Sequence, residues 1–250
     1  MPARMVVRIA VLASIALSAA FVIRATWIGA KIAALWSSPS DVYAHANREL
    51  PPKGAKLRVV LIGDSRIALW PASAFGERVE IVNRGIGGET LAQMARRFQP
   101  DAIALKPDVI VIQSGINDLV AATFMHEAAR GAVVRQTAET LRRLGKAGAA
   151  AGAQVLLTTI IPPGRPAILR LPVWNESLRD EVAEANSGLR RAVLPDHASL
   201  IDLSAALSGG DDRLLPDDFR VDALHLNRAG YDRFTDQLLR YLPATPAPSR

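Results

Sequence analysis

Short, almost continuously apolar runs alternate with amphipathic segments through the central part of this 250-residue chain. The clearest runs are Leu57–Ile62, Asp108–Ile112 and Gln154–Ile161, and two shorter ones are Val79–Val82 and Leu200–Leu203. A strand that is apolar at consecutive positions, rather than at every second one, is buried on both faces. The runs therefore predict a parallel sheet with helices on both sides.

Between these runs, apolar residues recur at helical spacing. Four such faces stand in the sequence: Leu91, Met94, Ala95 and Phe98; Val133, Thr137, Leu141 and Leu144; Leu178, Val182, Ala185 and Leu189; and Tyr231, Phe234, Leu238 and Tyr241. Asn227 is the expected N-cap of the last helix, and the Gly/Ala stretch after Leu144 is expected to end the second. The alternation predicts an α/β fold, a three-layer α/β/α sandwich with a mostly parallel five-stranded sheet.

The N-terminal segment, residues 1–36, has the pattern of a targeting or anchoring sequence. Ile9–Ile23 is free of charge and follows Arg4 and Arg8, as in a secretory signal. The apolar stretch extends to Ala30 if Arg24 snorkels, which is long enough to cross a bilayer. Both a cleaved signal and a membrane anchor fit, and the length favours the anchor. An amphipathic helix packed on the domain is the alternative. An exported protein is expected, either tethered outside the cytoplasm or secreted.

Charge and cysteine content narrow the classes of function. The net charge is +6, but residues 1–36 hold four basic and no acidic residues, so the remainder carries only +2. No basic run with interleaved aromatic residues is present, and this argues against a nucleic-acid partner. The chain has no cysteine, which excludes disulfides and thiolate metal sites.

The remaining boundaries follow from turn-forming residues. Residues 37–56 contain two clusters of turn-forming residues, Ser37–Ser40 and Pro51–Gly54, and are expected to form a linker. The folded domain is therefore expected to span 57–242. Residues 243–250, rich in Pro and small side chains, are expected to form a flexible tail. The sequence leaves the oligomeric state open.

Chemistry in a parallel sheet lies beyond the carboxyl ends of its strands, so the residues that follow each strand are the candidates. After the first strand comes Gly63–Arg66, where Ser65 stands on a tight strand-to-helix turn. Its hydroxyl is a candidate nucleophile and its N–H a candidate oxyanion donor; alternatively, Ser65 caps the next helix. The G-x-S-x-G elbow of lipases is absent, because Ile67 replaces its second glycine.

The second and third strands end in further candidate donors. Asn83–Thr90 is a glycine-rich loop whose N–H groups, including that of Gly88, can meet an oxyanion or a phosphate. It is not a complete dinucleotide motif, since Thr90 stands where a glycine is needed. In Ser114–Asp118, Asn117 offers a side-chain amide, although an Asn-Asp pair also suits a helix cap or turn.

A carboxylate precedes a histidine by three residues just before the last helix. Asp222 can reach the ring of His225 and fix its tautomer, as the acid of a nucleophile–base–acid triad does. An ordinary surface loop is the alternative. Among the other histidines, His45 lies in the expected linker and His126 near a helix start, and His197 is the second candidate base.

Together, these segments resemble the four sequence blocks of the SGNH, or GDSL-type, hydrolase family: Gly63-Asp64-Ser65, Gly88, Gly115-x-Asn117-Asp118 and Asp222-x-x-His225. The resemblance implies a flavodoxin-like sandwich, no metal and no organic cofactor. It implies that Ser65 is the nucleophile and an oxyanion donor, with Gly88 and Asn117 as further donors. Asp222 and His225 would complete the triad.

One position departs from the family motif. Arg66 stands where the family has Leu, and it is expected to face the helix or the rim of the site. The departure bears on substrate choice more than on activity.

The expected activity is hydrolysis of a carboxylic ester, of the esterase, lipase or lysophospholipase class, on a small-molecule, lipid or glycan substrate. Two alternatives stay open: a membrane-tethered O-acyltransferase acting on envelope polysaccharide, and a non-catalytic module that binds an acyl group or glycan. The connections 162–172 and 204–221 are expected to wall the pocket. Their arginines can meet an anionic head group or remain on a solvated surface: Arg165, Arg170, Arg213 and Arg220.

Overall fold

The computed structural model of the protein describes residues 3–37, 41–71, 75, 79–209 and 213–243. Five strands form one sheet, in the order β2-β1-β3-β4-β5. The strands are β1 (Leu57–Gly63), β2 (Val79–Gly85), β3 (Val109–Gln113), β4 (Gln154–Thr158) and β5 (Ala198–Ile201). Every pairing is parallel, and the order is that of flavodoxin-like sheets. The predicted α/β fold with a five-stranded parallel sheet is confirmed.

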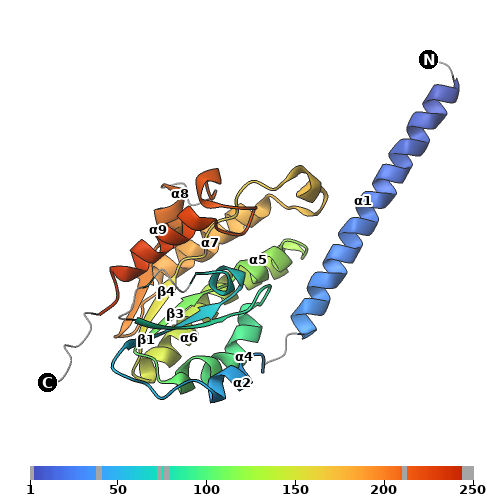
Figure 1. Ribbon diagram of the computed structural model, residues 1–250. Helices are drawn as coiled ribbons and strands as arrows, with labels where there is room; N and C mark the ends of the chain where they lie inside the picture. The colour runs from blue at the N-terminus through green and yellow to red at the C-terminus, as the bar shows by residue number, and fades with distance from the viewer. Residues whose placement is uncertain (1–2, 38–40, 72–74, 76–78, 210–212, 244–250) are drawn as a thin grey trace.

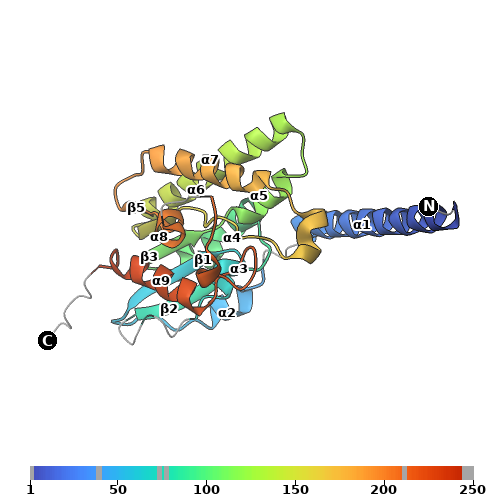
Figure 2. The ribbon, with the colours of Figure 1, turned by 90° about the horizontal axis from the view of Figure 1, so that it is seen from above.

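Helices cover both faces of the sheet, as Figures 1 and 2 show. One layer contains α4 (Leu91–Asp101), α5 (Ile116–Ala122), α6 (Glu127–Ala150) and α7 (Ser177–Arg191). The other contains α3 (Ser65–Ala68), α8 (Leu203–Ser208) and α9 (Arg228–Leu239). Short 3-10 turns are η2 (Ile103–Leu105), η3 (Ile168–Val173) and η4 (Asp217–Phe219). Alternate residues of β1 enter the two apolar cores, Val60 and Ile62 on one side and Val59 and Leu61 on the other.

The helix α6 runs further than its composition predicted. The Gly/Ala stretch was expected to end it, but the helix continues to Ala150. Gly145 and Gly148 lie against the sheet, where an added Cβ would come within 2.9 Å of Leu157 and 2.8 Å of Val155. These glycines therefore serve close helix–sheet packing, which outweighs their low helix propensity.

The last two strands end earlier than predicted. β4 stops at Thr158, because the Asn186 side chain bonds the N–H and C=O of Ile160 at 2.7 and 2.8 Å in place of a strand neighbour. β5 is Ala198–Ile201, because Asp202 caps α8 through the N–H of Ala205.

At the C-terminal end, the predicted cap of α9 is confirmed: Asn227 accepts the N–H of Gly230 at 3.0 Å. Tyr231, Phe234 and Leu238 are buried on this helix as expected. Tyr241 was wrongly placed on the same face, since it lies past the end of the helix and is 39% exposed. Of the expected tail, residues 244–250 lie outside the described residues.

Residues 41–50 pack on the sheet and on α4. They contain the short helix α2 (Ala44–Arg48). The Tyr43 hydroxyl donates to Gly85 O at 2.6 Å, and the Asn47 amide donates to Asp101 at 2.6 Å. This part of the chain therefore contacts the end of β2, close to the glycine-rich loop.

The first helix, α1 (Ala3–Ser37), projects away from the rest of the protein (Figures 1 and 2). Its segment Arg4–Trp27 is long and apolar enough to cross a membrane, and none of that stretch is buried. An apolar N-terminal helix of this kind is consistent with a signal sequence or an anchor.

Candidate active site

Ser65 occupies the first position of α3 and is separated from the inner strand β1 by Asp64 alone. The preceding residue, Asp64, is the N-cap, and its carboxylate accepts the N–H of Arg66 at 2.9 Å. The alternative in which Ser65 caps the helix is therefore wrong, and its hydroxyl is free for another partner. The turn packs tightly against the next strand: a Cβ on Gly85 would lie 2.2 Å from Ala68 N.

The partner of the Ser65 hydroxyl is the ring of His225. His225 Nε2 lies 3.0 Å from Ser65 Oγ, although the two residues are 160 positions apart in the chain. His225 Nδ1 lies 2.9 and 3.1 Å from the two carboxylate oxygens of Asp222. An N–H at Nδ1 directed at this carboxylate leaves Nε2 as a proton acceptor facing the serine.

The carboxylate of Asp222 is held ionised by its surroundings. Burial alone would raise its pKa, but the His225 ring and the backbone N–H groups of Leu224 and His225 donate to it. These hydrogen bonds outweigh burial, and the pKa of Asp222 lies below its usual value. The same bonds fix the loop, and Val221 N–H donates to His225 O at 3.0 Å.

Three N–H donors lie on the turns that follow β1, β2 and β3. Among the described residues, neither Ser65 N–H nor Gly88 N–H has a protein acceptor. Gly88 has φ +77°, a conformation that favours glycine. The Asn117 amide donates one hydrogen to Glu89 O at 3.0 Å, which fixes its side chain and leaves the other hydrogen for a ligand.

A buried ion cluster supports the glycine-rich loop. The guanidinium of Arg97 pairs with Glu89 and, at 3.2 Å, with Asp101, and all three side chains are almost fully buried. Glu89 directly follows Gly88 and is also the residue that Asn117 contacts. Sequence analysis missed this cluster. The spacing of Arg97 and Asp101 on one helix face was a signal, but burial of the group could not be read from it.

Arg66 was expected to face either the helix or the rim of the site; its side chain is fully buried, so the rim is excluded. Its Nε donates to Leu224 O and its Nη1 to Ile161 O, both at 2.8 Å. Leu224 immediately precedes His225, so the guanidinium ties the histidine loop to the segment after β4. Burial lowers the pKa of Arg66 and raises that of its neighbour Asp64.

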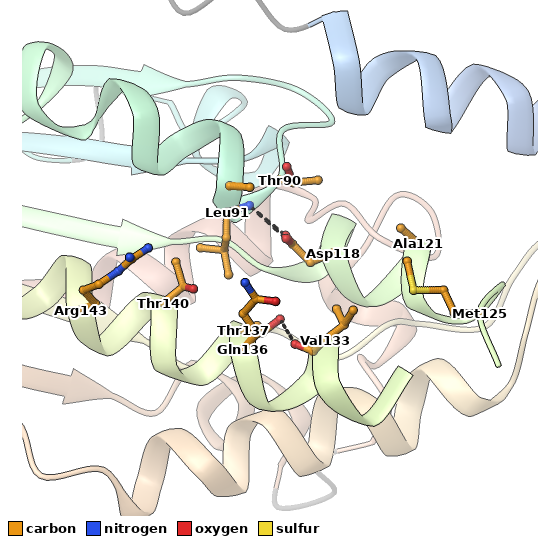
Figure 3. Close-up of a pocket in the computed structure, with 11 residues that line it drawn as sticks. Thr90, Leu91, Asp118, Ala121, Met125, Val133, Gln136, Thr137, Thr140 and Arg143 are labelled. Carbon is orange, nitrogen blue, oxygen red and sulfur yellow. Dashed lines mark hydrogen bonds between the residues drawn. The ribbon is translucent and has the colours of Figure 1, made fainter. Parts of the chain in front are cut away.

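A cavity of about 240 Å³ lies beside the connections that follow β2 and β3, between the start of α4 and the helices α5 and α6 (Figure 3). Asp118 points toward it and accepts the N–H of Leu91 at 3.0 and 3.2 Å. Burial raises the pKa of Asp118 to about 7, although these hydrogen bonds act in the opposite direction. Asp118 thus joins the start of α4 to α5 next to Asn117.

The other histidines lie away from Ser65. His197 precedes β5 and so lies at the opposite edge of the sheet. His126 caps α6, and His45 pairs with Glu49. Within the described part of the chain, no group of three His, Asp or Glu side chains is placed to hold a metal ion.

The arrangement combines a hydroxyl, an imidazole that can take its proton, and a carboxylate that orients the imidazole. N–H donors of two turns and one amide lie at the same edge of the sheet. Such a set can catalyse acyl transfer from an ester through a covalent serine intermediate.

Comparison with known proteins agrees with this chemistry. Residues 61–233 match the model of the GDSL-like lipase/acylhydrolase family. A curated acetylxylan esterase of Geobacillus stearothermophilus is 44% identical over 41 residues. That match spans 16% of this chain and only 19% of the esterase.

Solved structures share the fold over most of the chain. A candidate acylhydrolase from Bacteroides fragilis is 27% identical with a TM-score of 0.66, covering 82% of this chain and 96% of its own. A GDSL-like lipase from Bacteroides thetaiotaomicron is 22% identical with a TM-score of 0.63, covering 80% and 95%. The latter likeness concerns the fold alone.

Proposed function

Because the chain belongs to the GDSL-like lipase/acylhydrolase family, and so to the ester hydrolases of the SGNH class, we propose that it cleaves a carboxylic ester with Ser65 as nucleophile. The observation that carries the proposal is the 3.0 Å contact between Ser65 Oγ and His225 Nε2, with Asp222 bound to the other ring nitrogen. The substrate is an acyl or acetyl ester of a lipid or carbohydrate.

In the first half of the reaction, Ser65 Oγ attacks the acyl carbon while His225 Nε2 takes the hydroxyl proton. The carbonyl oxygen becomes an oxyanion, which the N–H groups of Ser65 and Gly88 and the Asn117 amide stabilise. Each such donor is worth about 3 kcal/mol in the transition state. His225 then gives its proton to the leaving alcohol, and the acyl group stays on Ser65.

In the second half, water replaces the alcohol. His225 takes a proton from the water as the water attacks the acyl carbon, and it returns that proton to Ser65 Oγ as the acid leaves. Asp222 stays ionised throughout and stabilises the imidazolium. Its lowered pKa supports this role.

The test uses the full-length chain in detergent micelles with p-nitrophenyl acetate. We expect hydrolysis by the unmodified chain, and its loss in Ser65→Ala and in His225→Ala. His45→Ala, which changes an exposed histidine, is the matched control and should keep full turnover. Equal turnover in the control and in both site variants would refute the proposal.

The same experiment separates hydrolysis from transfer. The apolar helix α1 also suits an O-acyltransferase held near envelope polysaccharide. Added sugar should leave acetate as the main product if water is the natural acceptor. Acetylated sugar in excess of acetate would instead assign the acyltransferase function to the same triad.

We also propose that α1 is a membrane anchor and that the catalytic domain lies outside the cytoplasm. The support is the uncharged run Ile9–Ile23 behind Arg4 and Arg8, on a helix whose apolar side chains are exposed. Sedimentation of the expressed protein with the membrane fraction, resistant to high salt, is the expected result.

A further inference from the structure

The described contacts between α1 and the rest of the protein include Arg24 and Trp27. Trp27 packs on Phe124, which follows α5, with ring centres 5.2 Å apart. Arg24 lies over the same Phe124 ring at 5.3 Å. The helix also contacts η3, and Figure 2 shows η3 beside it where α1 leaves the body.

This junction marks a depth in the membrane. The segment Arg4–Trp27 has 24 residues, which as a helix measures about 36 Å and slightly exceeds a hydrocarbon core of about 30 Å. Trp27 closes the segment, and tryptophan favours the boundary between hydrocarbon and water. With α1 as the proposed anchor, Phe124 and η3, which contact α1 near Trp27, are expected at the level of the lipid head groups.

The same junction reaches the catalytic loop. The residues that line a cavity of about 30 Å³ include Trp27, Phe124, Trp174 and Leu224. Leu224 is the neighbour of His225 in the chain. Trp27 of α1 and the neighbour of His225 thus line the same small cavity.

Exposed apolar side chains lie on the same edge of the molecule. Ile168 is 83% exposed and Leu171 53% exposed on η3, and Val221, next to Asp222, is 69% exposed. Leu69, which follows the helix of Ser65, is 57% exposed. All four stand on connections that leave the carboxyl ends of strands, around the candidate active site. Exposure of several large apolar side chains to water is unfavourable, and such side chains often mark a binding surface.

Two arginines accompany the apolar residues of η3. Arg165 and Arg170 are exposed on either side of Ile168, and among the described residues neither guanidinium pairs with a carboxylate. In contrast, Arg213 pairs with Asp180, and Arg220 with Asp217. Apolar side chains flanked by arginines suit a membrane surface. The apolar side chains enter the acyl region of the lipid, and the arginines bind the phosphates of the head groups.

We propose that the η3 segment, with Ile168 and Leu171 inserted, docks on the surface of the membrane that α1 crosses, so that the active site opens toward lipid. The occupant of this surface is the phospholipid head-group and upper acyl region. The proposal rests on the proposed function for its catalytic consequence, which is that the ester substrate is a lipid taken from the bilayer. The docking itself is independent of activity.

Depth of insertion tests the docking directly. The chain has no cysteine, so single cysteines can be placed without removing others. Ile168→Cys and, as a control, Val193→Cys carry an environment-sensitive fluorophore on the full-length chain in phospholipid vesicles. Val193 is 87% exposed and lies in the connection before β5, at the opposite edge of the sheet.

We expect lipid carrying a spin label near the head group to quench the fluorophore at 168 and not at 193. Equal, weak quenching at both positions overturns the proposal. Shielding at 168 from an aqueous quencher without lipid quenching also overturns it, because a protein partner or a second copy of the chain would then cover η3.

Turnover measurements test whether the ester substrate is a lipid taken from the bilayer. Ile168→Glu combined with Leu171→Glu is compared with Val193→Glu, both in full-length chains in vesicles. We expect the double variant to hydrolyse a long-chain ester embedded in the vesicle about 10-fold more slowly, because charged side chains no longer enter the lipid. Hydrolysis of dissolved p-nitrophenyl acetate should change much less in the double variant than hydrolysis of the embedded ester, because the small ester reaches the site from water.

An equal effect on both esters, or on neither, contradicts lipid delivery through η3. Absence of any hydrolysis by the unmodified chain would contradict the proposed function instead, and the quenching result would still decide whether η3 docks on the membrane.

Discussion

Arg66 is the residue at which this chain departs most clearly from the sequence blocks of its family. Its guanidinium is buried beside the triad and bonds two backbone carbonyls, those of Leu224 and Ile161. A leucine fills similar space but donates no hydrogen bond. The position therefore shapes the histidine loop from beneath rather than the rim where substrate enters.

We expect Arg66→Leu to lower kcat about 10-fold or more while KM stays constant, because a loosened Leu224 lets His225 drift from Ser65. Arg66→Lys, which can still reach one carbonyl, should restore part of the loss. Steady-state kinetics with p-nitrophenyl acetate give both constants, and circular dichroism checks the fold. Unchanged kcat in a folded Arg66→Leu protein would show that the histidine loop keeps its position without the Arg66 hydrogen bonds.

Asn117 is expected to act only in the transition state. Its amide donates one hydrogen to Glu89 O, and the second hydrogen is the proposed oxyanion donor. Asn117→Ala should lower kcat about 100-fold or more with little change in KM. If the variant retains full turnover, the oxyanion donor lies elsewhere.

Asp118 makes stability depend on pH. Its pKa is raised to about 7, against about 4 in an unfolded chain. Between these values the folded protein keeps a proton that the unfolded chain releases, so this residue's contribution to stability falls as the pH rises from 4 to 7.

In Asp118→Asn, that titration is absent. The free energy of unfolding of the variant, relative to the original chain, should therefore increase from pH 4 to pH 7 and stay level above. Denaturant titrations at several pH values measure the difference. A difference that does not change with pH would mean that Asp118 ionises as readily in the folded protein as in the unfolded one.

At the scale of elements, Gly85 at the end of β2 and Gly87 in the turn that follows differ in the space available for a side chain. A Cβ at Gly85 would lie 2.2 Å from Ala68 N in the Ser65 turn, whereas nothing lies within 4 Å of a Cβ at Gly87. Gly85→Ala must displace α3 or the end of β2. We expect it to lower the stability by about 1–3 kcal/mol and to reduce turnover.

Gly87→Ala is the matched control, with the same chemical change a short distance away. It should keep both stability and turnover. Thermal unfolding and p-nitrophenyl acetate hydrolysis of the two variants make the comparison. Similar behaviour of both would indicate that α3 does not need close contact with Gly85.

The sequence predicted elements best where local pattern and burial agree. β1 and β3 were placed to within one residue, because their continuous apolar runs are buried at every position. β4 ended early because the Asn186 side chain, from a distant helix, takes the hydrogen bonds of Ile160. The end of α6 was predicted too early for a similar reason, because its glycines serve packing against the sheet rather than helix termination.

The candidate site divides in the same way. Ser65 could be proposed from its place after a predicted strand, and Asp222 and His225 from their spacing before the last helix. The structure brings these three together. The Arg97 cluster and the buried position of Arg66 depend on packing between elements, which no local pattern encodes.

For the whole molecule, alternation of strands and helices was enough to predict the sandwich and its order of layers. The position of α1 against η3 could not be predicted, because it depends on contacts between Trp27 and Phe124 across the body of the protein. With η3 docked as proposed, that position turns an apolar N-terminal segment and an ester hydrolase fold into a molecule whose active site faces the membrane.

Covalent trapping of the nucleophile decides whether this chain uses the triad at all. The full-length protein in detergent is treated with a fluorophosphonate, digested and analysed by mass spectrometry. We expect one adduct per chain, on the peptide that contains Ser65, with its formation greatly slowed in His225→Ala and unaffected in His45→Ala. An adduct on another residue, or none on a folded and unmodified chain, would contradict the assignment of Ser65 as the nucleophile.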